Sequence, residues 1–352
     1  MLNFTVGPVQ EYENVLKIGG NRTPYFRNAS FSKIMLENEE MLKELAYAPA
    51  DARAVFLTAS GTGAMEAAVM NLFTGRDKVL VVNGGGFGKR FSEICDVHHI
   101  PCQELVVPFE EALTEEMLSQ YEGQNFTGLL INMNETSIGK LYDMNLVADF
   151  CRRNHLWLVV DAISAFLADP FDMQKWGIDV MIASSQKALA VPPGISMLVL
   201  SDRAVKRVND MQAESFYFNL ADALKNGERG QTPFTPAVSI LLQVHARLQE
   251  LVKIGVEQEN QRIADLAAHF REGMKSLPFT IACPSLSNAV TPLMTEGISA
   301  HWIFEELERK YHIWVCPNGG ELRDKLFRVG HIGDLTFEDN EYLLEAFQKI
   351  LA

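Results

Sequence analysis

The stretch Asp179-Val-Met-Ile-Ala-Ser-Ser-Gln-Lys187-Ala-Leu-Ala-Val-Pro-Pro-Gly194 says most about how this chain folds. It begins as an apolar strand, places one lysine just beyond that strand, and stops at a Pro-Pro-Gly turn. A second apolar strand, Leu156–Val160, leads directly into Asp161. Because the carboxyl ends of parallel strands meet at one edge of a sheet, the two segments predict a site at that edge.

Lys187 and Asp161 each have an ordinary structural interpretation as well. A lysine at a strand end is usually a solvated cap, and an aspartate there usually caps the next helix. The flanks of Lys187 carry no other charge, however, and a lysine is costly to desolvate unless something uses it. A lysine for a Schiff base and an acid for a pyridinium nitrogen are what pyridoxal phosphate chemistry requires.

The composition is that of an ordinary globular protein with an excess of acidic residues. The chain has 352 residues, of which 47% are hydrophobic and 22% charged, and this length favours two domains. A net charge of −14 and a pI near 5.1 disfavour nucleic acid and anionic membrane as partners. An anionic small molecule is still allowed, because backbone dipoles can hold a phosphate.

The cysteines and histidines indicate a reducing compartment and no metal site. Five scattered cysteines without CxxC spacing favour the cytoplasm over a disulfide framework. The histidines lack ligand spacing, and the adjacent pair His98-His99 is interpreted as structural. The first residues do not resemble a signal peptide, and Val180–Leu200 contains a lysine and two prolines, which argues against a membrane span.

Residues 53–210 alternate short apolar runs with helix-like segments, a rhythm that predicts an α/β fold with a mostly parallel sheet between helices. The strands expected in this region are Ala54–Thr58, Lys78–Val82, Glu104–Val107, Gly128–Asn132, Trp157–Asp161, Val180–Ser184 and Met197–Ser201. The helices expected there are Ala64–Phe73, Phe87–Cys95, Thr114–Gln120, Leu146–Asn154 and Asp202–Val208.

The rest of the chain predicts a smaller domain. Leucines and valines between about 237 and 276 recur at the spacing of a long amphipathic helix. Residues 278–352 then alternate strands with helices at Ala300–Lys310 and Glu338–Leu351, which indicates an α+β domain. We expect an irregular N-terminal arm over 1–30 that packs on the site or a dimer interface, a large domain over 31–255 and a small domain over 256–352.

Two glycine-rich segments follow strands and predict ligand contacts. In Thr58–Glu66, small residues at a helix start leave N–H groups free for a phosphate, although a capped helix without a ligand is the alternative. In Val81–Arg90, glycines on both sides of Phe87 let its ring lie flat on a planar ligand. A core phenylalanine in a glycine-rich turn is the alternative there.

Two further segments offer polar groups. Asn132–Gly139 ends another strand with hydroxyls and an acid, as expected when several strand ends converge on one site. Arg328 lies between Phe327 and Val329 in an apolar strand, so it should have a bidentate anionic partner such as a carboxylate. A structural salt bridge with one of the excess acids is the alternative.

With these residues in view, the chain resembles the class V aminotransferases, which are fold-type-I pyridoxal phosphate enzymes. The nearest subgroup contains the alanine–glyoxylate, serine–pyruvate and 2-aminoethylphosphonate–pyruvate aminotransferases. The likeness runs from Gly7-Pro8 to Arg328-Val-Gly, and it rests on Ser60-Gly-Thr-Gly-Ala-Met-Glu66, Val-Asp161-Ala and Ser-Gln186-Lys187-Ala-Leu. It implies a large domain with a mostly parallel seven-stranded sheet between helices, and a small C-terminal α+β domain.

The resemblance also implies the roles of individual residues. Lys187 would carry the Schiff base, and Asp161 would pair with the pyridine nitrogen. Phe87 would stack on the ring, Ile163 would pack near the other face, and Thr136 would lie near the ring hydroxyl. The residues implied to hold the phosphate are Ser60, Gly61, Thr62 and Gln186.

The implied substrate side consists of Gly7 and Arg328, with Arg328 binding the substrate carboxylate. The segment Gln231–Pro236, which contains Thr235, looks like the one that reaches the partner subunit's phosphate. The resemblance therefore implies a homodimer with shared active sites.

The implied activity is transfer of an amino group between an alanine- or serine-like amino acid and a pyruvate- or glyoxylate-like 2-oxo acid, with Lys187 as the general base. A 2-aminoethylphosphonate–pyruvate aminotransferase is an alternative. So is a pyridoxal phosphate lyase of the cysteine desulfurase kind, for which Cys316 is the candidate nucleophile, although its apolar surroundings favour a buried strand cysteine. A nicotinamide dehydrogenase using Gly84–Gly88 and a catalytically silent protein of the same fold are further alternatives.

Overall fold

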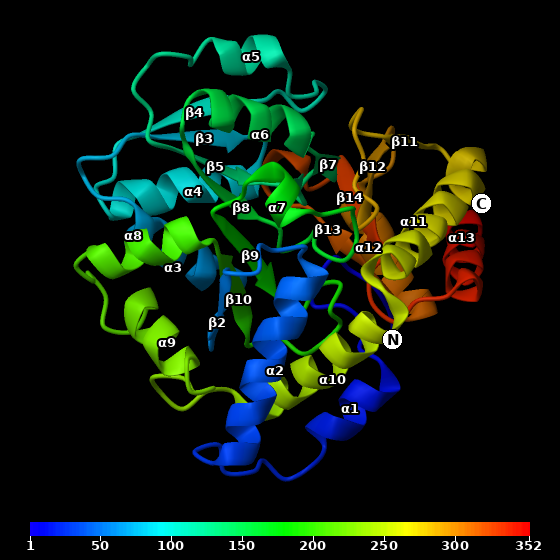
Figure 1. Cartoon of the computed structure of the whole chain (residues 1–352). Coiled ribbons are helices and arrows are strands. Elements are labelled where there is room, and N and C mark those ends of the chain that lie inside the picture. Colours follow the sequence, from blue (N-terminus) through cyan, green and yellow to red (C-terminus); the bar gives the residue numbers. More distant parts are fainter.

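The computed structural model describes all 352 residues, Met1–Ala352, and is built around two sheets (Figure 1). The larger sheet has seven strands in the order β2-β10-β9-β8-β5-β3-β4. All of its strands are parallel except β10, which runs antiparallel to both of its neighbours. The mostly parallel seven-stranded sheet predicted from the sequence is therefore confirmed.

The strands of this sheet lie within about two residues of the positions expected from the sequence, a usual margin for element ends. Their bounds are β2 (Arg53–Leu57), β3 (Val79–Asn83), β4 (Cys102–Val106), β5 (Gly128–Asn132), β8 (Trp157–Asp161), β9 (Val180–Ser184) and β10 (Ser196–Leu200). Alternate side chains of β3 enter different cores: Val79 and Val81 pack on one face, and Leu80 and Val82 pack on the other. Burial on both faces explains why these strands are continuous apolar runs.

Helices cover both faces of the large sheet. One face packs on α3 (Gly61–Leu72), α4 (Gly86–Val97), α8 (Asp202–Asp210) and α9 (Leu220–Gly227). The other face packs on α2 (Ala29–Leu45), α6 (Met144–Arg153), α7 (Met173–Trp176) and α10 (Val238–Ile254). A short helix, α5 (Glu115–Ser119), and a two-stranded ribbon, β6 (Asn134–Glu135) with β7 (Lys140–Leu141), complete this region. No helix is both long and apolar enough to span a bilayer.

The smaller sheet has the order β1-β13-β14-β12-β11 and packs on three helices (Figure 1). Its strands are β1 (Leu2–Phe4), β11 (Phe279–Ile281), β12 (Val290–Thr295), β13 (Ile313–Pro317) and β14 (Leu326–Gly330). The helices are α11 (Val256–Gly273), α12 (Ala300–Tyr311) and α13 (Phe337–Leu351), with single 3-10 turns at Met274–Ser276 and Gly320–Leu322.

The long helix expected over residues 237–276 is in fact two helices, α10 and α11, separated at Gly255. Gly255 has a φ of 89°, a conformation that glycine adopts without strain and that ends α10. Helix α10 contributes to the core of the large sheet, whereas Leu266 and Phe270 of α11 lie in the core of the small sheet. We keep a domain boundary near Gly255 as a proposal.

The N-terminal segment is more regular than the sequence suggested. Strand β1 pairs in parallel with β13, and helix α1 (Glu13–Gly19) buries Val15 in the core that also contains α10. The expectation of an irregular arm over 1–30 was wrong for these two elements. The first residues thus belong to the small sheet, and the chain then continues onto the large one.

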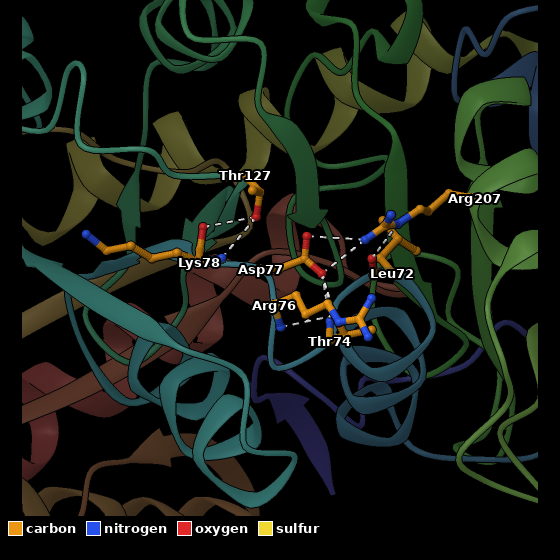
Figure 2. A network of polar contacts seen from close by, with 7 residues as sticks. All are labelled: Leu72, Thr74, Arg76, Asp77, Lys78, Thr127 and Arg207. Carbon is orange, nitrogen blue, oxygen red and sulfur yellow. Dashed lines mark hydrogen bonds and ion pairs between the residues drawn. The ribbon is translucent and has the colours of Figure 1, made fainter.

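A network of hydrogen bonds and one ion pair connects residues at the N-terminal ends of β3 and β5 in the large sheet (Figure 2). Asp77 accepts hydrogen bonds from the backbone and hydroxyl of Thr74 and pairs with Arg207 of α8 at 3.0 Å. The backbone N–H of Lys78 donates to the Thr127 hydroxyl at 3.1 Å. This network lies at the opposite ends of the strands from Asp161 and Lys187, so its role is structural.

Candidate active site

The carboxyl ends of β2, β3, β5, β8 and β9 all lie at one edge of the large sheet, because these strands share one direction. Each strand leads into a segment that the sequence analysis singled out. In that order the segments contain Ser60, Phe87, Thr136, Asp161 and Lys187. The predicted convergence of strand ends is therefore present in the fold.

The N-terminal segment closes on Lys187. The Nζ atom of Lys187 donates a hydrogen bond to the carbonyl oxygen of Val6 at 2.5 Å. A Cβ added to Gly7 would lie 2.7 Å from the Lys187 side chain, and Gly7 also has a φ of 130°, so glycine is required there. Burial lowers the pKa of Lys187 to about 8, which makes its neutral, nucleophilic form accessible near neutral pH.

Asp161 is a buried acid at the end of β8, with 6% of its surface exposed. Its Oδ1 accepts a hydrogen bond from the backbone N–H of Ile163 at 2.8 Å, which fixes the orientation of the carboxyl group. Burial raises the pKa of Asp161 to about 6, and this hydrogen bond and the nearby positive charge of Lys187 oppose that shift. The site therefore contains an acid and a base whose pKa values have moved toward each other.

Ser60, Gly61 and Thr62, the predicted phosphate cradle, lie at the start of α3. Ser60 is the N-cap of α3, and its Oγ accepts a hydrogen bond from the backbone N–H of Gly63 at 3.3 Å. A Cβ added to Gly61 would lie 2.5 Å from Cδ1 of Ile163, so the cradle and the Asp161 loop are in direct contact. The side chain of Thr62 accepts a hydrogen bond from Nη1 of Arg90 at 3.1 Å.

Phe87 is held in place through its backbone by Glu135, which is completely buried. The Glu135 carboxylate accepts hydrogen bonds from the N–H groups of Phe87 at 3.1 Å and Gly88 at 2.9 Å, in the first turn of α4. It also accepts from the side chain of Asn132 at 3.1 Å. A carboxylate is stabilised at a helix N-terminus, and this one fixes the loop that carries Phe87 to the end of β5.

Arg328 is buried without an acidic partner, so the structural salt bridge considered from the sequence is absent. Its exposed fraction is 9%. Nη1 donates to the carbonyl oxygen of Thr136 and Nη2 to that of Pro317, both at 2.9 Å, and Nε has no partner. Carbonyl oxygens orient the guanidinium without neutralising it, which leaves a fixed positive charge available to an anion.

The remaining predicted residues have the following positions. The hydroxyl of Thr136 lies 2.6 Å from that of Ser164, which follows Asp161 closely in the chain. The side-chain oxygen of Gln186 accepts from the Ser184 hydroxyl at 2.6 Å. Thr235 is exposed on the segment that runs beside the cradle, where the Ala237 N–H donates to the Thr58 hydroxyl at 3.0 Å.

Two residues near the site, Arg90 and Glu135, were not assigned a role there from the sequence, and Cys316 was considered only as the nucleophile of a lyase. Arg90 contacts Thr62 and lies over the Phe87 ring, with its Cζ 4.8 Å from the ring centroid. Glu135 was noted only as part of a polar strand end. Cys316, interpreted as a buried strand cysteine, is only partly buried. Its strand alternates buried and partly buried positions, a pattern that the uniformly apolar run Ile313–Cys316 does not reveal.

Residues 8–320 match the family model described as "Aminotransferase class-V". An "Uncharacterized aminotransferase" of Helicobacter pylori strain J99 is 30% identical over 363 residues, covering 100% of this chain and 94% of that protein. A "Soluble hydrogenase, small subunit" of Synechococcus sp. PCC 6716 is 28% identical, with 98% of this chain and 91% of that protein covered. A "Serine--glyoxylate aminotransferase" of Methylorubrum extorquens is 26% identical, with 95% and 86% covered.

A solved structure of an aminotransferase has the same fold as this chain. The "aspartate aminotransferase which belongs to subgroup IV" from Thermus thermophilus superposes with a TM-score of 0.92 and is 26% identical. The similarity covers 100% of this chain and 99% of that one. Both sheets and the joining helices therefore have counterparts in a known protein.

Proposed function

The chain belongs to the class V aminotransferases, and from this premise we propose that it moves an amino group between a small amino acid such as alanine or serine and a 2-oxo acid such as pyruvate or glyoxylate. It is a pyridoxal phosphate-dependent transaminase. The proposed substrates follow the name of a relative that acts on serine and glyoxylate. The observation that carries the proposal is Arg328, a buried cation without an acidic partner.

The residues present fit pyridoxal phosphate. Gly61 and Ser60 form a helix start without bulky side chains, as a phosphate requires. Asp161 is a buried acid suited to a ring nitrogen, and Lys187 is an amine whose pKa is lowered by burial. Phe87 would stack on the ring, Ile163 would pack against the opposite face, and the bound cofactor would accept the electron pair that leaves the substrate Cα.

We propose that Lys187 carries out the proton transfers. A general base works best when its pKa lies near the operating pH, and burial brings the pKa of Lys187 to about 8. Asp161 would keep a proton on the ring nitrogen, because its carboxyl group is ionised once the pH exceeds its pKa of about 6, and a buried positive charge beside it lowers that pKa further. Thr136, Thr62 and Gln186 are proposed to hold the remaining polar groups of the cofactor.

Arg328 is proposed to bind the substrate carboxylate and to orient the bond at Cα. Its two terminal nitrogens are fixed by the carbonyl oxygens of Thr136 and Pro317, so the guanidinium is ordered before a ligand binds. Preorganisation of this kind lowers the entropy cost of aligning the substrate. Gly7 packs directly on the Lys187 side chain, where a residue with a Cβ would clash, and is proposed to lie on the substrate side of the site.

We further propose a cytoplasmic homodimer in which Thr235 reaches the phosphate of the partner subunit. Thr235 is exposed and lies next to two exposed aromatic rings, Phe216 at 85% and Tyr217 at 44%. Phe234 stacks on Tyr217 with 5.5 Å between ring centroids. A cluster of exposed aromatics beside the cradle supports an interface there, because such clusters are uncommon on free surfaces. Sedimentation of wild type and Phe216→Ser would test it, with a shift to monomer expected for the variant.

The proposed function is tested with a panel of amino donors: alanine, serine, aspartate and 2-aminoethylphosphonate. Conversion of the cofactor spectrum to the pyridoxamine form by alanine or serine supports it, whereas conversion by 2-aminoethylphosphonate alone supports the phosphonate alternative. Because Cys316 is partly accessible, sulfide release from cysteine should be measured as well, and rapid release would favour a lyase. Borohydride reduction followed by peptide mapping must place the cofactor on Lys187.

A further inference from the structure

Cys316 points to the active-site side of the small sheet. In β13, Ile313 and Val315 are fully buried in the core beneath the helices, and Cys316 occupies the alternate position. Successive side chains of a strand point to opposite faces, so the Cys316 thiol lies on the face away from that core. The sequence interpretation of Cys316 as a buried strand cysteine is therefore corrected.

Arg328 shares this face. It stands directly opposite Cys316 in the antiparallel pair of β13 with β14, and directly opposite residues place their side chains on the same side. Its neighbours Phe327 and Val329 enter the core. Arg328 itself reaches the large domain at Thr136, and its buried Nε has no partner. Cys316 therefore shares its surface with a buried guanidinium that has no acidic partner and one N–H without a hydrogen bond.

Lys187 approaches this face from the large domain. Strand β1 pairs Phe4 with Val315, the residue before Cys316, and Val6, two residues beyond Phe4, accepts the hydrogen bond of the Lys187 amine. The Lys187 amine is therefore held beside the end of β13 that carries Cys316. The segment Val6-Gly7 closes the space beside them, because Val6 accepts the hydrogen bond from Lys187.

We propose that the Cys316 thiol contacts the bound substrate beside its Cα, and that it limits the amino donor to a short side chain. This rests on the proposed function, since it requires the substrate Cα at Lys187 and the carboxylate at Arg328. A substrate held at those two points must pass along the face on which Cys316 lies. The thiol is small and weakly polar, which suits the side chain of alanine or serine better than a long or branched one.

Alkylation with iodoacetamide tests the contact without using turnover. Two cysteines of the chain are partly accessible, Cys102 and Cys316, so Cys102 is an internal control in the same peptide map. Aminooxyacetate and methoxyamine both capture the cofactor aldehyde, but only aminooxyacetate carries a carboxylate. On the holoenzyme, aminooxyacetate should slow alkylation of Cys316 about tenfold or more relative to methoxyamine, because access controls thiol reactivity. Cys102 should be alkylated at the same rate with either compound. Equal rates at Cys316 would overturn the proposal.

Substitutions test the effect on specificity. Cys316→Ala should increase kcat/KM for 2-aminobutyrate relative to alanine about tenfold, the scale of one methylene in a pocket. Cys316→Leu should lower kcat/KM for alanine, chiefly through KM, while the melting temperature and cofactor content stay unchanged. If Cys316→Leu does not fold, the Cys316→Ala variant and the alkylation experiment still test the proposal. An unchanged donor ratio in Cys316→Ala would contradict the proposal.

The outcomes separate this proposal from the proposed function. If no amino donor converts the cofactor to the pyridoxamine form, the proposed function fails, whatever happens at Cys316. If alanine or serine converts it while Cys316 is alkylated at the same rate in both ligand states, the proposed function stands and the contact of Cys316 with the substrate is refuted.

Discussion

The side-chain nitrogen of Lys187 donates a hydrogen bond to the backbone carbonyl oxygen of Val6, 2.5 Å away. Val6 follows β1, which is itself paired with β13 of the small sheet. The lysine from the large sheet is thus held against a segment that the small sheet anchors. The candidate active site lies where the two sheets meet, so we expect substitutions on either sheet to affect catalysis.

Replacing Lys187 with alanine should abolish turnover. A positioned general base contributes about 10²–10⁴-fold to the rate, and Lys187 is also the proposed point of cofactor attachment. The measurement is the steady-state rate with alanine and glyoxylate. Lys89→Ala, which changes an exposed lysine of α4, is the control and should keep full activity. Normal turnover by Lys187→Ala would refute the assignment of the base.

The reactivity of Lys187 in the cofactor-free protein should rise with pH through a midpoint of about 8. Burial lowers the pKa of its amine, and only the neutral amine attacks a carbonyl, so the reacting fraction increases as pH passes the pKa. Pyridoxal followed by borohydride reduction and quantification of the Lys187 peptide would give the midpoint. A value near the ordinary lysine pKa of about 10.4 would contradict the expectation.

Asp161→Asn should stabilise the cofactor-free protein near neutral pH. The folded chain keeps the Asp161 proton up to about pH 6, whereas the unfolded chain loses it near 3.8. The free energy of unfolding of the wild type therefore falls between those values as pH rises, and the variant lacks this loss. Above them the variant should be more stable by something on the order of 2–3 kcal/mol.

Urea unfolding at about pH 4 and pH 7 measures this difference, with Asp149→Asn on the exposed side of α6 as the control. With pyridoxal phosphate bound, the order should reverse, because the variant cannot supply the anionic partner of the ring nitrogen. A stability difference that is the same at both pH values would show that the carboxyl group does not keep its proton on folding.

Arg328→Ala should raise KM for carboxylate substrates about tenfold to a hundredfold, with a smaller effect on kcat. A hydrogen bond to a charged group is worth about 1.5–3 kcal/mol, and the fixed guanidinium has no other anion to bind. Steady-state kinetics with alanine and glyoxylate give both constants. Arg323→Ala, on the exposed turn before β14, should leave KM unchanged. An unchanged KM in Arg328→Ala would mean that another residue binds the carboxylate.

Arg90→Gln should weaken binding of pyridoxal phosphate about tenfold. The variant loses the hydrogen bond to Thr62 and the cation over the Phe87 ring, each worth on the order of 1 kcal/mol. Titration of the cofactor-free protein by intrinsic fluorescence gives the Kd. The neighbouring Lys89→Gln is the matched control. Because Thr62 is proposed to hold the phosphate, the affinity for pyridoxal, which has no phosphate, should fall less than the affinity for pyridoxal phosphate.

The large sheet was predictable because its strands are buried on both faces and are followed by glycine-rich or polar turns. Strand β1 was not, because three residues have no pattern of their own and are fixed by β13 near the other end of the chain. The break at Gly255 was also missed, since the apolar spacing of α10 continues into α11 and only the backbone conformation of one glycine separates them.

Some residues of the candidate site could likewise be predicted from the sequence, and others could not. Lys187, Asp161 and Arg328 are conspicuous in the sequence because each is an ionisable group beside an apolar strand. Arg90 could not be identified from the sequence, because it stands beside another basic residue, Lys89. Only the packing of α4 against α3 determines that Arg90 is the one that reaches Thr62. Glu135 owes its role to the N-terminus of a helix that begins far from it in the chain.

The pairing of β1 with β13 has a consequence for biosynthesis. The N-terminus emerges from the ribosome first, whereas β13, the strand with which β1 pairs, is translated near the end of the chain. The large sheet can form on the nascent chain, but Val6 and Gly7 cannot take their places beside Lys187 until β13 has been translated. The enzyme should therefore acquire its active site only at the end of synthesis, and nascent chains that stop before Ile313 should be folded in part but inactive.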